Sequence, residues 1–448
     1  MNYLGIDLGT TSMKFLVINE NGIIYKNSIN YPVIYYNNGY AEQDPLLWLK
    51  AFKKLYKNMD VKIDSIGITG QMHSLVLTNN GKPLINSILW LDNRSYKFSK
   101  YLTRKFGTEN LIEETGNYPL SNFTLLRLLW ISKYNKNIYK NANKAFVAKD
   151  WLKFMLTGVH GTDVTDGSGT YLFNVRSRKW SDKLFNGLNM DKKLFGDAFE
   201  SGDIHGYYNG IPVIAGAGDQ EAAAYGNNLT LNDVGISLGT SGVVFAKINN
   251  YKIPENKSIH LFCDAKRNRW HWMGVTQSAA SSLDWFIKAF NIKYSQLKNL
   301  NGFSRVLFMP YLNGERAPIM DTDIRGLFYN LSPDTGINDF IISIMQGVAF
   351  SLRHVYDSMN IHRKNIILTG GGTRIDSWNQ IISNVFNMPV KVKEDSGSAL
   401  GAAMLSSHGD IDIDASYKLY YPENHDIYDD LYIKYRNMVK RIAKPDKL

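Results

Sequence analysis

Two short polar turns with nearly the same sequence stand far apart in this chain. Residues 5–12 read Gly-Ile-Asp-Leu-Gly-Thr-Thr-Ser, and residues 235–242 read Gly-Ile-Ser-Leu-Gly-Thr-Ser-Gly. In both, an aliphatic run leads into a Gly-Thr turn and a second apolar run, a pattern typical of two strands joined by a tight turn. The amides and hydroxyls of such a turn can face a phosphate. One such turn is an ordinary hairpin, but the matched pair predicts a nucleotide held between two lobes.

Asp219 is the carboxylate best placed for catalysis. A strand-like run at residues 211–214 is followed by small residues, which let a ligand approach the backbone, and Asp219 then opens an alanine-rich helix. An aspartate there is more often an N-cap, but the neighbouring phosphate turn favours a base. Phosphoryl transfer from ATP to a hydroxyl needs one carboxylate to accept the proton and usually a second to hold magnesium through waters. Asp219 suits the first role and Asp7 the second, although spacing alone does not join them.

A third candidate nucleotide element is the triple glycine Gly370-Gly371-Gly372, which follows a strand-like run and precedes a helix starting near Asp376. Three glycines permit flat contact with adenine or ribose, which side chains would block. Taken alone, this motif is equally well explained as a plain connecting loop. The small residues at 397–403 can form a helix start that packs closely behind the glycines, and this favours a nucleotide floor.

The elements that must position these residues follow from hydrophobic periodicity. Strands are predicted at residues 3–8, 14–18, 23–28 and 65–69, the last leading into Gln71, Met72 and His73, and a strand at 87–89 leads into Trp90. Polar residues at strand ends are where open α/β sheets place ligands. Helices are predicted at residues 44–58, with Asp44 as N-cap, and at 279–290, 338–360, 377–385 and 426–442.

Composition excludes several classes of protein. The 448 residues are 44% hydrophobic and 21% charged, as in an ordinary globular chain long enough for two domains. The single cysteine, Cys263, allows no internal disulfide or cysteine-based metal cluster, and no apolar run approaches the roughly 20 residues that span a bilayer. A strand already at residue 3, interrupted by Asp7 and Lys14, does not suit a signal peptide, so we expect a cytoplasmic protein. The net charge of +10 is dispersed, which argues against nucleic acid as a partner and favours an anionic substrate such as ATP only modestly.

On these motifs the chain resembles the FGGY family of carbohydrate kinases over essentially its whole length. The order and spacing of the motifs make the resemblance specific. The motifs are the Asp7 turn, Gln71-Met72-His73, Trp90-Leu91-Asp92-Asn93-Arg94, Lys149-Asp150, Leu156-Thr157-Gly158, Thr162-Asp163 through Asp166, Gly169-Thr170, the Asp219 segment, Ser237-Leu238-Gly239-Thr240-Ser241, Pro-Tyr-Leu-Asn-Gly-Glu-Arg-Ala-Pro at residues 310–318, and Gly370-Gly371-Gly372.

The resemblance implies an α/β protein of two actin-like, ribonuclease-H-like domains, each with a five-stranded mixed sheet. The expected N-terminal, sugar-binding domain is residues 1–230, and the expected C-terminal, nucleotide-binding domain is residues 231–448. ATP, Mg²⁺ and a small-molecule sugar would bind in the cleft between them, and dimers are common in the family. The implied roles are catalysis and metal binding by Asp7 and Asp219, sugar contact by Met72, His73, Gln220 and Trp90, and nucleotide contact by Thr10, Thr11, Gly239, Thr240, Gly370, Gly371 and Gly372.

Within the family, the resemblance is greatest to members that phosphorylate D-xylulose. It depends on Gly70-Gln71-Met72-His73, residues 150–158, residues 170–173 and residues 270–280. The residue after Met-His is Ser74, where those members typically have glycine, and a serine at this point is similar to members that act on gluconate. D-xylulose is therefore the first expectation, and gluconate or another ketose or polyol is the alternative.

Two of these residues, His73 and Trp90, also have ordinary structural interpretations. A lone histidine at a strand end, such as His73, is usually a polar surface or cap residue, and Trp90 alone is as well explained as a core or rim aromatic. A nucleotide-binding switch of the same fold is the alternative outside enzymes. A repressor would need an added DNA-binding arm and a chaperone a separate peptide-binding domain, neither of which the sequence indicates, and a non-catalytic switch would be expected to lose Asp7 or Asp219.

Overall fold

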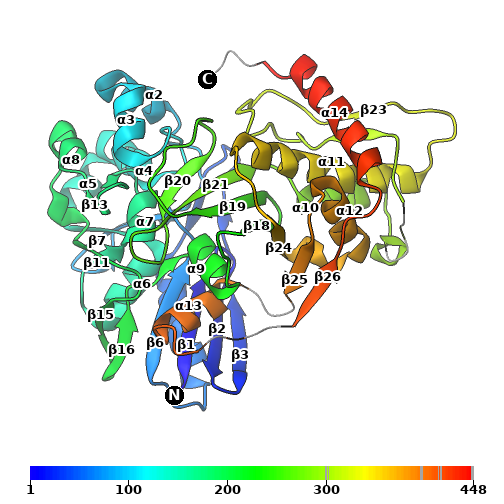
Figure 1. Cartoon of the computed structure of the whole chain (residues 1–448). Coiled ribbons are helices and arrows are strands. Elements are labelled where there is room, and N and C mark those ends of the chain that lie inside the picture. The colour runs from blue at the N-terminus through cyan, green and yellow to red at the C-terminus, as the bar shows by residue number, and fades with distance from the viewer. Residues whose placement is uncertain (298–299, 301, 394–396, 412, 414–415, 445–448) are drawn as a thin grey trace.

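The chain folds into two lobes, each built around a mixed β-sheet with helices on its faces (Figure 1). The computed structural model describes residues 1–297, 300, 302–393, 397–411, 413 and 416–444. The expected two-domain α/β architecture is confirmed. Within this described part each main sheet has seven strands, where the resemblance implies five. The extra strands lie at the sheet edges or arise where one strand is interrupted.

The first sheet holds the first of the two repeated turns. The strands β1, β6 and β16 run parallel, and β2 and β3 continue antiparallel from β1. A kink at Gly216, with φ of 80°, separates β16 from β17, and β17 then resumes pairing with β6. The spatial order is β15 (Ile204–Tyr208), β16 (Ile211–Ile214), β6 (Ser65–Gly70), β1 (Tyr3–Leu8), β2 (Ser12–Asn19) and β3 (Gly22–Asn30), with β17 (Ala217–Gly218) also beside β6.

The second sheet repeats this plan around the second turn. Its β18 pairs antiparallel with β19 and parallel with β24, as β1 does with β2 and β6. The spatial order is β20 (His260–Cys263), β21 (Trp270–Thr276), β19 (Gly242–Ile248), β18 (Asp233–Leu238), β24 (Asn365–Thr369), β25 (Val390–Lys393) and β26 (Tyr417–Tyr420). The helices of this lobe are α10 (Ala280–Ala289), α11 (Ile337–Ser358), α12 (Asp376–Phe386) and α14 (His425–Ile442).

The helices expected from apolar periodicity are confirmed to within two residues at each end. For α1, the carboxylate of Asp44 accepts a hydrogen bond from the amide of Leu46, and Pro45 is the first helical residue, as predicted. The other helices of the first lobe are α2 (Lys97–Phe106), α3 (Thr108–Thr115), α4 (Thr124–Tyr134), α5 (Lys136–Asn141), α6 (Ala148–Thr157), α7 (Val164–Gly169), α8 (Asp182–Leu188) and α9 (Asp219–Gly226), after α1 (Pro45–Lys57).

Smaller elements complete the two lobes. A six-stranded sheet in the first lobe joins β4, β5, β7, β8, β9 and β10. Among the described residues, no helix combines the length and apolar character that crossing a membrane requires. The small strands are β4 (Ile34–Tyr35), β5 (Ala41–Gln43), β7 (Leu75–Asn79), β8 (Lys82–Pro83), β9 (Ser87–Ile88), β10 (Lys144–Val147), β11 (Gly161–Asp163), β12 (Phe173–Asn174), β13 (Lys179–Trp180), β14 (Asp197–Phe199), β22 (Leu307–Met309) and β23 (Leu327–Tyr329), and the short 3₁₀ helices are η1 (Lys192–Leu194), η2 (Tyr294–Leu297) and η3 (Gly371–Arg374).

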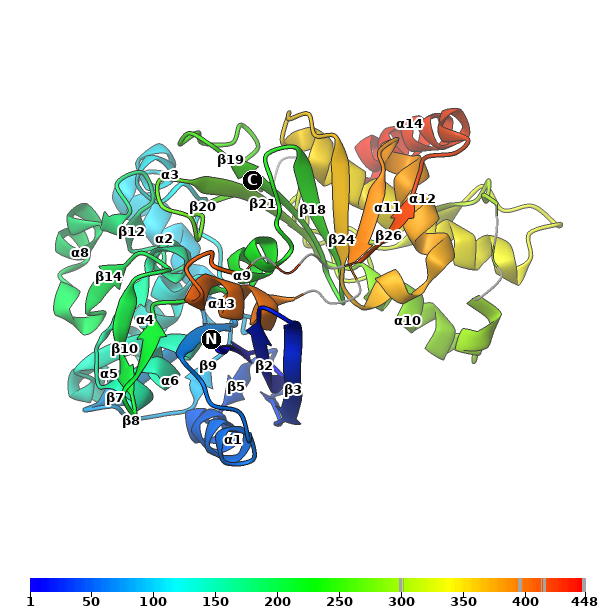
Figure 2. The same cartoon turned by 60° about the horizontal axis from the view of Figure 1, so that its bottom comes forward.

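Helix α13 (Ser398–Ser406) lies on the first lobe, although it comes late in the sequence (Figures 1 and 2). It packs on β1, β6 and α9, whereas η3, which contains two of the three glycines, packs on α12, β18 and β24. The prediction that residues 397–403 pack behind the triple glycine is therefore wrong. The reason is close backbone packing: a Cβ at Gly5 would lie 1.9 Å from the carbonyl oxygen of Ala399, and one at Gly401 would lie 1.7 Å from that of Ala222. The division of the chain at residue 230 stays a prediction.

Candidate active site

Three parallel strands of the first sheet end side by side and deliver the predicted site residues to one place. Asp7 on β1 and Ala217 on β17 both pair with Thr69 of β6, from opposite sides. Because neighbouring strands lie about 4.8 Å apart, the backbones at Asp7 and Ala217 are roughly 10 Å apart. Asp219 follows directly after β17, and residues 71–73 follow β6. The sheet topology thus joins carboxylates that sequence spacing could not join.

The carboxylate of Asp7 is buried at the first turn. Its Oδ2 lies 3.3 Å from Nζ of Lys14, the residue that pairs with Asp7 across the β1–β2 hairpin. Its Oδ1 is buried and has no hydrogen-bond partner among the described residues. An unsatisfied buried carboxylate oxygen is a fitting ligand for a hydrated divalent cation, which takes oxygen ligands. Lys14 was not among the predicted site residues, although a charge in an otherwise apolar strand was a usable signal.

Asp219 begins α9, but Gly218 occupies the N-cap position, so the capping interpretation of Asp219 does not hold. The Asp219 side chain is partly exposed toward the cleft. Burial of the carboxyl and the negative charges of Asp7 and Glu221 raise the pKa of Asp219 to about 7. A carboxylate with a pKa near neutrality can accept a proton at physiological pH and release it again. This is the property expected of a general base.

Met72 packs on the backbone before Asp219, and His73 follows Met72 in the chain. A Cβ at Gly218 would lie 2.9 Å from Cγ and Sδ of Met72, so Met72 packs directly on the backbone before Asp219. The ring of His73 is buried, with Nδ1 2.7 Å from the carbonyl oxygen of Gly169. A carbonyl only accepts, so Nδ1 carries the proton and Nε2 is left as an acceptor. Burial lowers the pKa of His73 to about 4, and a neutral ring can accept a hydrogen bond from a hydroxyl.

The remaining predicted residues of the first lobe surround its turn. Trp90 donates a hydrogen bond from Nε1 to Oγ1 of Thr10 at 3.1 Å, and both side chains are partly exposed. Thr11 is exposed at the tip of the turn. Gln220 is partly exposed on the first turn of α9, next to Asp219. Trp90 is thus a neighbour of the phosphate turn as well as a candidate for sugar contact.

The predicted nucleotide residues of the second lobe form one group. Gly239 and Thr240 make the second turn, and Ser237, one residue before Leu238, pairs with Thr369 at the end of β24. Gly370 follows with φ of 98°, and a Cβ on it would lie 2.7 Å from the carbonyl carbon and oxygen of Leu238. Gly371 is exposed with no atom near its Cβ position, and Gly372 is buried against Leu238. The triple glycine therefore presents bare backbone beside the second turn.

One cavity is lined by residues of both lobes. Its lining includes Gln220 of α9 from the first lobe and Ser237 and Thr369 from the second. The structure thus places Asp7, Met72, His73, Gln220 and Asp219 around one strand end, and sets the glycine-rich group on the opposite lobe.

A buried pair that was not predicted joins the lobes below Asp219. Oε1 of Glu221 on α9 lies 3.1 Å from Nε2 of His271 on β21, and both side chains are fully buried. Burial raises the pKa of Glu221 to about 8 and lowers that of His271 to about 3, so both are neutral at pH 7. Arg316, on the residue 310–318 loop of the second lobe, lies near enough for its charge to lower the pKa of His73. The sequence motif at residues 310–318 could have indicated Arg316. The Glu221–His271 contact joins segments that only the fold brings together, so no sequence motif indicates it.

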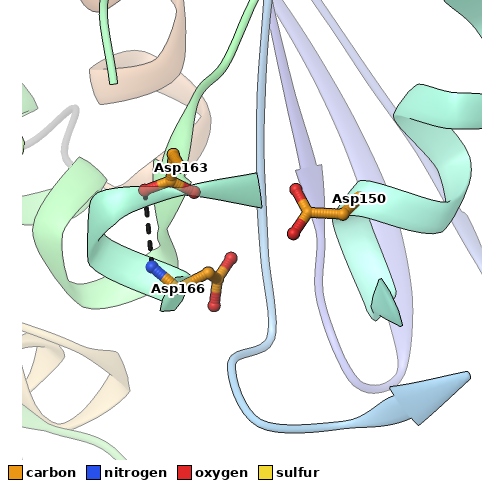
Figure 3. Close-up of side chains that lie close together, drawn as sticks. All are labelled: Asp150, Asp163 and Asp166. Carbon is orange, nitrogen blue, oxygen red and sulfur yellow. Dashed lines mark hydrogen bonds between the residues drawn. The ribbon is translucent and has the colours of Figure 1, made fainter. Parts of the chain in front are cut away.

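Three buried carboxylates, those of Asp150, Asp163 and Asp166, converge between α6, β11 and α7 (Figure 3). Their spacing would suit a metal ion, but Nζ of Lys149 lies 2.7, 2.5 and 3.0 Å from one oxygen of each. The ammonium group of Lys149 thus occupies the position that a metal ion would take. Burial and the negative charges of Asp163 and Asp150 raise the pKa of Asp166 well above its usual value, although the charge of Lys149 opposes this. Lys153 is a second cation in the cluster, with Nζ 3.0 Å from Oδ1 of Asp150.

Comparison with known proteins agrees with this geometry. The N-terminal domain of the FGGY family of carbohydrate kinases matches residues 2–226, and the C-terminal domain of that family matches residues 234–409. The xylulose kinase of Lactococcus lactis subsp. lactis (strain IL1403) is 34% identical over 442 residues, with 91% of this chain and 87% of that protein covered. The xylulose kinase of Bacillus subtilis (strain 168) is 32% identical over 443 residues, covering 91% and 88%. The crystal structure of a xyloylose kinase from Brucella ovis superposes with a TM-score of 0.92 at 29% identity, covering 98% and 99%.

These matches cover both lobes and nearly the whole chain. The chain belongs to the FGGY family of carbohydrate kinases, as the sequence motifs predicted. It is a carbohydrate kinase, an enzyme that transfers a phosphoryl group to a sugar, and kinases of this family use ATP.

Proposed function

We propose that the enzyme transfers the γ-phosphoryl group of ATP to D-xylulose, giving D-xylulose 5-phosphate, with Asp219 as the general base. The observation that carries this proposal is the position of Asp219, one strand away from Asp7 and beside Met72, with its pKa raised to about 7. The names of the relatives, which are xylulose kinases at 32–34% identity over 91% of this chain, support the sugar.

In the proposed reaction Asp219 accepts the proton of the sugar 5-hydroxyl as that oxygen attacks the γ-phosphorus of ATP. The new O–P bond forms, the bond from the γ-phosphorus to its bridging oxygen breaks, and ADP leaves with that electron pair. Asp219 then releases the proton to solvent. Met72 and His73 hold the sugar, His73 by accepting a hydroxyl hydrogen bond at Nε2, and Gln220 and Trp90 complete its contacts.

The phosphates are placed between the turns of the two lobes. Thr10 and Thr11 contact them from the first lobe, Gly239 and Thr240 from the second, and the glycines at 370–372 lie under the adenosine. Asp7, with its unsatisfied buried Oδ1, and Asp219 are the residues that would hold Mg²⁺. Bound Mg²⁺ would supply charge neutralisation of the phosphates. Closure of the lobes on the sugar would exclude the water that competes for the phosphoryl group.

The position that argued for gluconate has another explanation. Oγ of Ser74 donates to Oε1 of Gln71 and accepts from the amide of Trp90, both at 3.0 Å, and the side chain is fully buried. Both bonds stay within the loops that carry Met72 and Trp90. Serine here is therefore accounted for as a loop support, and it does not favour gluconate over D-xylulose.

The test is sugar-dependent ADP release with Mg-ATP, measured with D-xylulose, L-xylulose, D-ribulose, D-gluconate and glycerol. We expect D-xylulose to give the highest kcat/KM. Asp219→Asn is expected to lower kcat by about 10²- to 10⁴-fold, the usual contribution of a general base. The matched control is Asp182→Asn, because Asp182 is exposed on α8, and its one ion pair among the described residues is with Lys192 at 2.8 Å.

Each proposed element can fail separately. Higher turnover with gluconate would replace the sugar but keep the kinase chemistry. Normal turnover by Asp219→Asn would remove Asp219 as the base. Absence of turnover with every sugar, together with intact ATP binding, would favour a nucleotide-binding switch.

A further inference from the structure

Helix α7 contacts two segments of the proposed sugar site, the one that precedes Asp219 and the one that contains His73. At its first turn, Oγ1 of Thr165 accepts a hydrogen bond from the amide of Gly218 at 2.8 Å, and Gly218 is the residue before the base Asp219. At its last residue, the carbonyl oxygen of Gly169 accepts from Nδ1 of His73 at 2.7 Å. One short helix thus holds the strand end before the base and the ring of the sugar-binding histidine.

The N-terminal end of α7 is held by a single carboxylate. Oδ1 of Asp163 accepts hydrogen bonds from the amide of Thr165 at 2.8 Å and from Oγ1 of Thr165 at 2.5 Å. It also accepts one from the amide of Asp166 at 3.4 Å (Figure 3). The other oxygen of Asp163 lies 2.5 Å from Nζ of Lys149. Because Oγ1 of Thr165 donates its only proton to Asp163, its lone pairs are directed to the amide of Gly218. The hydroxyl therefore has one defined orientation.

A second contact from the same cluster reaches the same segment. Nζ of Lys153 donates a hydrogen bond at 2.8 Å to the carbonyl oxygen of Ala215, while it lies 3.0 Å from Oδ1 of Asp150. Ala215 precedes Gly216, where the chain kinks between β16 and β17. The buried charges thus fix both ends of the four-residue segment that leads to Asp219, at Ala215 and at Gly218.

Packing leaves little freedom between these contacts. A Cβ at Gly169 would lie 2.9 Å from the ring of His73 and 3.2 Å from Cε of Met72, and Met72 also packs on Gly218. All six residues of α7 are buried. Movement of α7 would therefore displace His73, Met72 and the backbone before Asp219 together.

We infer that α7 is a positioning element of the active site, in which Thr165 fixes the base Asp219 and Gly169 fixes His73 relative to one another. The Lys149 cluster holds α7 in place and carries no metal. The role rests on the proposed function, because it assumes that Asp219 is the base and His73 a sugar contact. Thr165 acts through Gly218, so it is a positioning residue and not a catalytic one.

The test is Thr165→Val, which keeps the volume of the side chain but removes the hydroxyl. We expect kcat to fall at least tenfold while the KM for ATP stays within about twofold, because the nucleotide contacts lie elsewhere. Thr165→Ser restores the hydroxyl and should recover most of the lost kcat.

The matched control is Thr162→Val. Thr162 is buried on β11, next to Asp163. Its hydroxyl contacts the Asp163 carbonyl at 3.4 Å and the carboxylate of Asp150 in the Lys149 cluster, but no contact with Ala215 or Gly218 is present among the described residues. A merely structural role for the cluster predicts equal losses of kcat for the two valine variants. That result, or failure of serine to restore kcat, would overturn the inference.

Two measures keep the test decisive. If Thr165→Val does not fold, as judged by thermal unfolding, Thr165→Ala replaces it with the same expected outcomes, because it introduces no new contact. All variants are assayed with the sugar that gives the highest wild-type kcat/KM. A wrong assignment of the sugar therefore leaves this test intact, and a wrong assignment of the base would already be evident from Asp219→Asn.

Discussion

The two repeated turns share a backbone plan but are held in different ways. In the first lobe, side chains from distant segments hold the turn: the hydroxyl of Tyr31 donates to the carbonyl oxygen of Gly9, and Nε1 of Trp90 donates to Oγ1 of Thr10. In the second lobe, the start of α10 holds the turn through main-chain amides. The amide of Ala280 donates to the carbonyl oxygen of Gly239, and the amide of Ala279 to that of Thr240.

The chemistry at equivalent positions differs as well. Asp7 of the first turn corresponds to Ser237 of the second, so the first lobe carries a carboxylate where the second carries a neutral hydroxyl. Asp7 has a lysine partner and a free buried oxygen, and it influences the pKa of Asp219. The two turns thus share a backbone plan, and the first of them lies beside the carboxylates of Asp7 and Asp219, which we propose to act in catalysis.

The strongest way to break this comparison is to replace the polar side chain at the equivalent position of each turn. Asp7→Asn is expected to lower kcat on the order of 10²-fold, the scale observed when one group that stabilises developing charge is lost. Ser237→Ala should cost no more than about tenfold, because it removes at most a neutral hydrogen bond. Steady-state kinetics with D-xylulose and Mg-ATP measures both. Equal losses would show that the turns share the chemistry.

The pH dependence sharpens the same comparison. Asp219 must be ionised to accept a proton, and its pKa is about 7, so kcat/KM for the sugar should fall about tenfold per unit below pH 7 and level off above it. The negative charge of Asp7 contributes to this raised pKa. Asp7→Asn should therefore move the acid midpoint below 7, while Ser237→Ala should leave it in place. An unchanged midpoint in Asp7→Asn would contradict the proposed coupling of the two carboxylates.

Most of the fold and part of the site could be predicted from local sequence. The first strand, the capped helix after Asp44 and the closing helix are encoded by apolar periodicity and by capping residues, which act over a few positions. The pairing of Lys14 with Asp7 needed only the hairpin register. The Lys149 cluster and the Glu221–His271 contact join segments far apart in the chain, so no local pattern contains them.

The position of α13 shows a different limit of prediction. Its run of small residues correctly indicated close backbone packing, but small residues do not specify a partner. The partner is set by matching glycines elsewhere, Gly5 and Gly67 on the first sheet, where added Cβ atoms would lie 1.9 and 2.0 Å from carbonyl oxygens of α13. Those glycines stand alone among apolar strand residues, and only the assembled sheet brings them to one face.

The smallest expected difference concerns the hydrogen bonds that hold each turn. Trp90→Phe removes the 3.1 Å bond to Oγ1 of Thr10 but keeps the aromatic packing, and we expect the KM for ATP to rise about two- to tenfold, the value of one hydrogen bond. Ser281→Ala removes a 2.7 Å bond to the carbonyl oxygen of Thr240, which still accepts from the amide of Ala279, so its effect should stay within about twofold. Kinetics with ATP varied at saturating sugar compares the two. If Trp90→Phe raised only the KM for the sugar, Trp90 would act at the sugar directly and not through the turn.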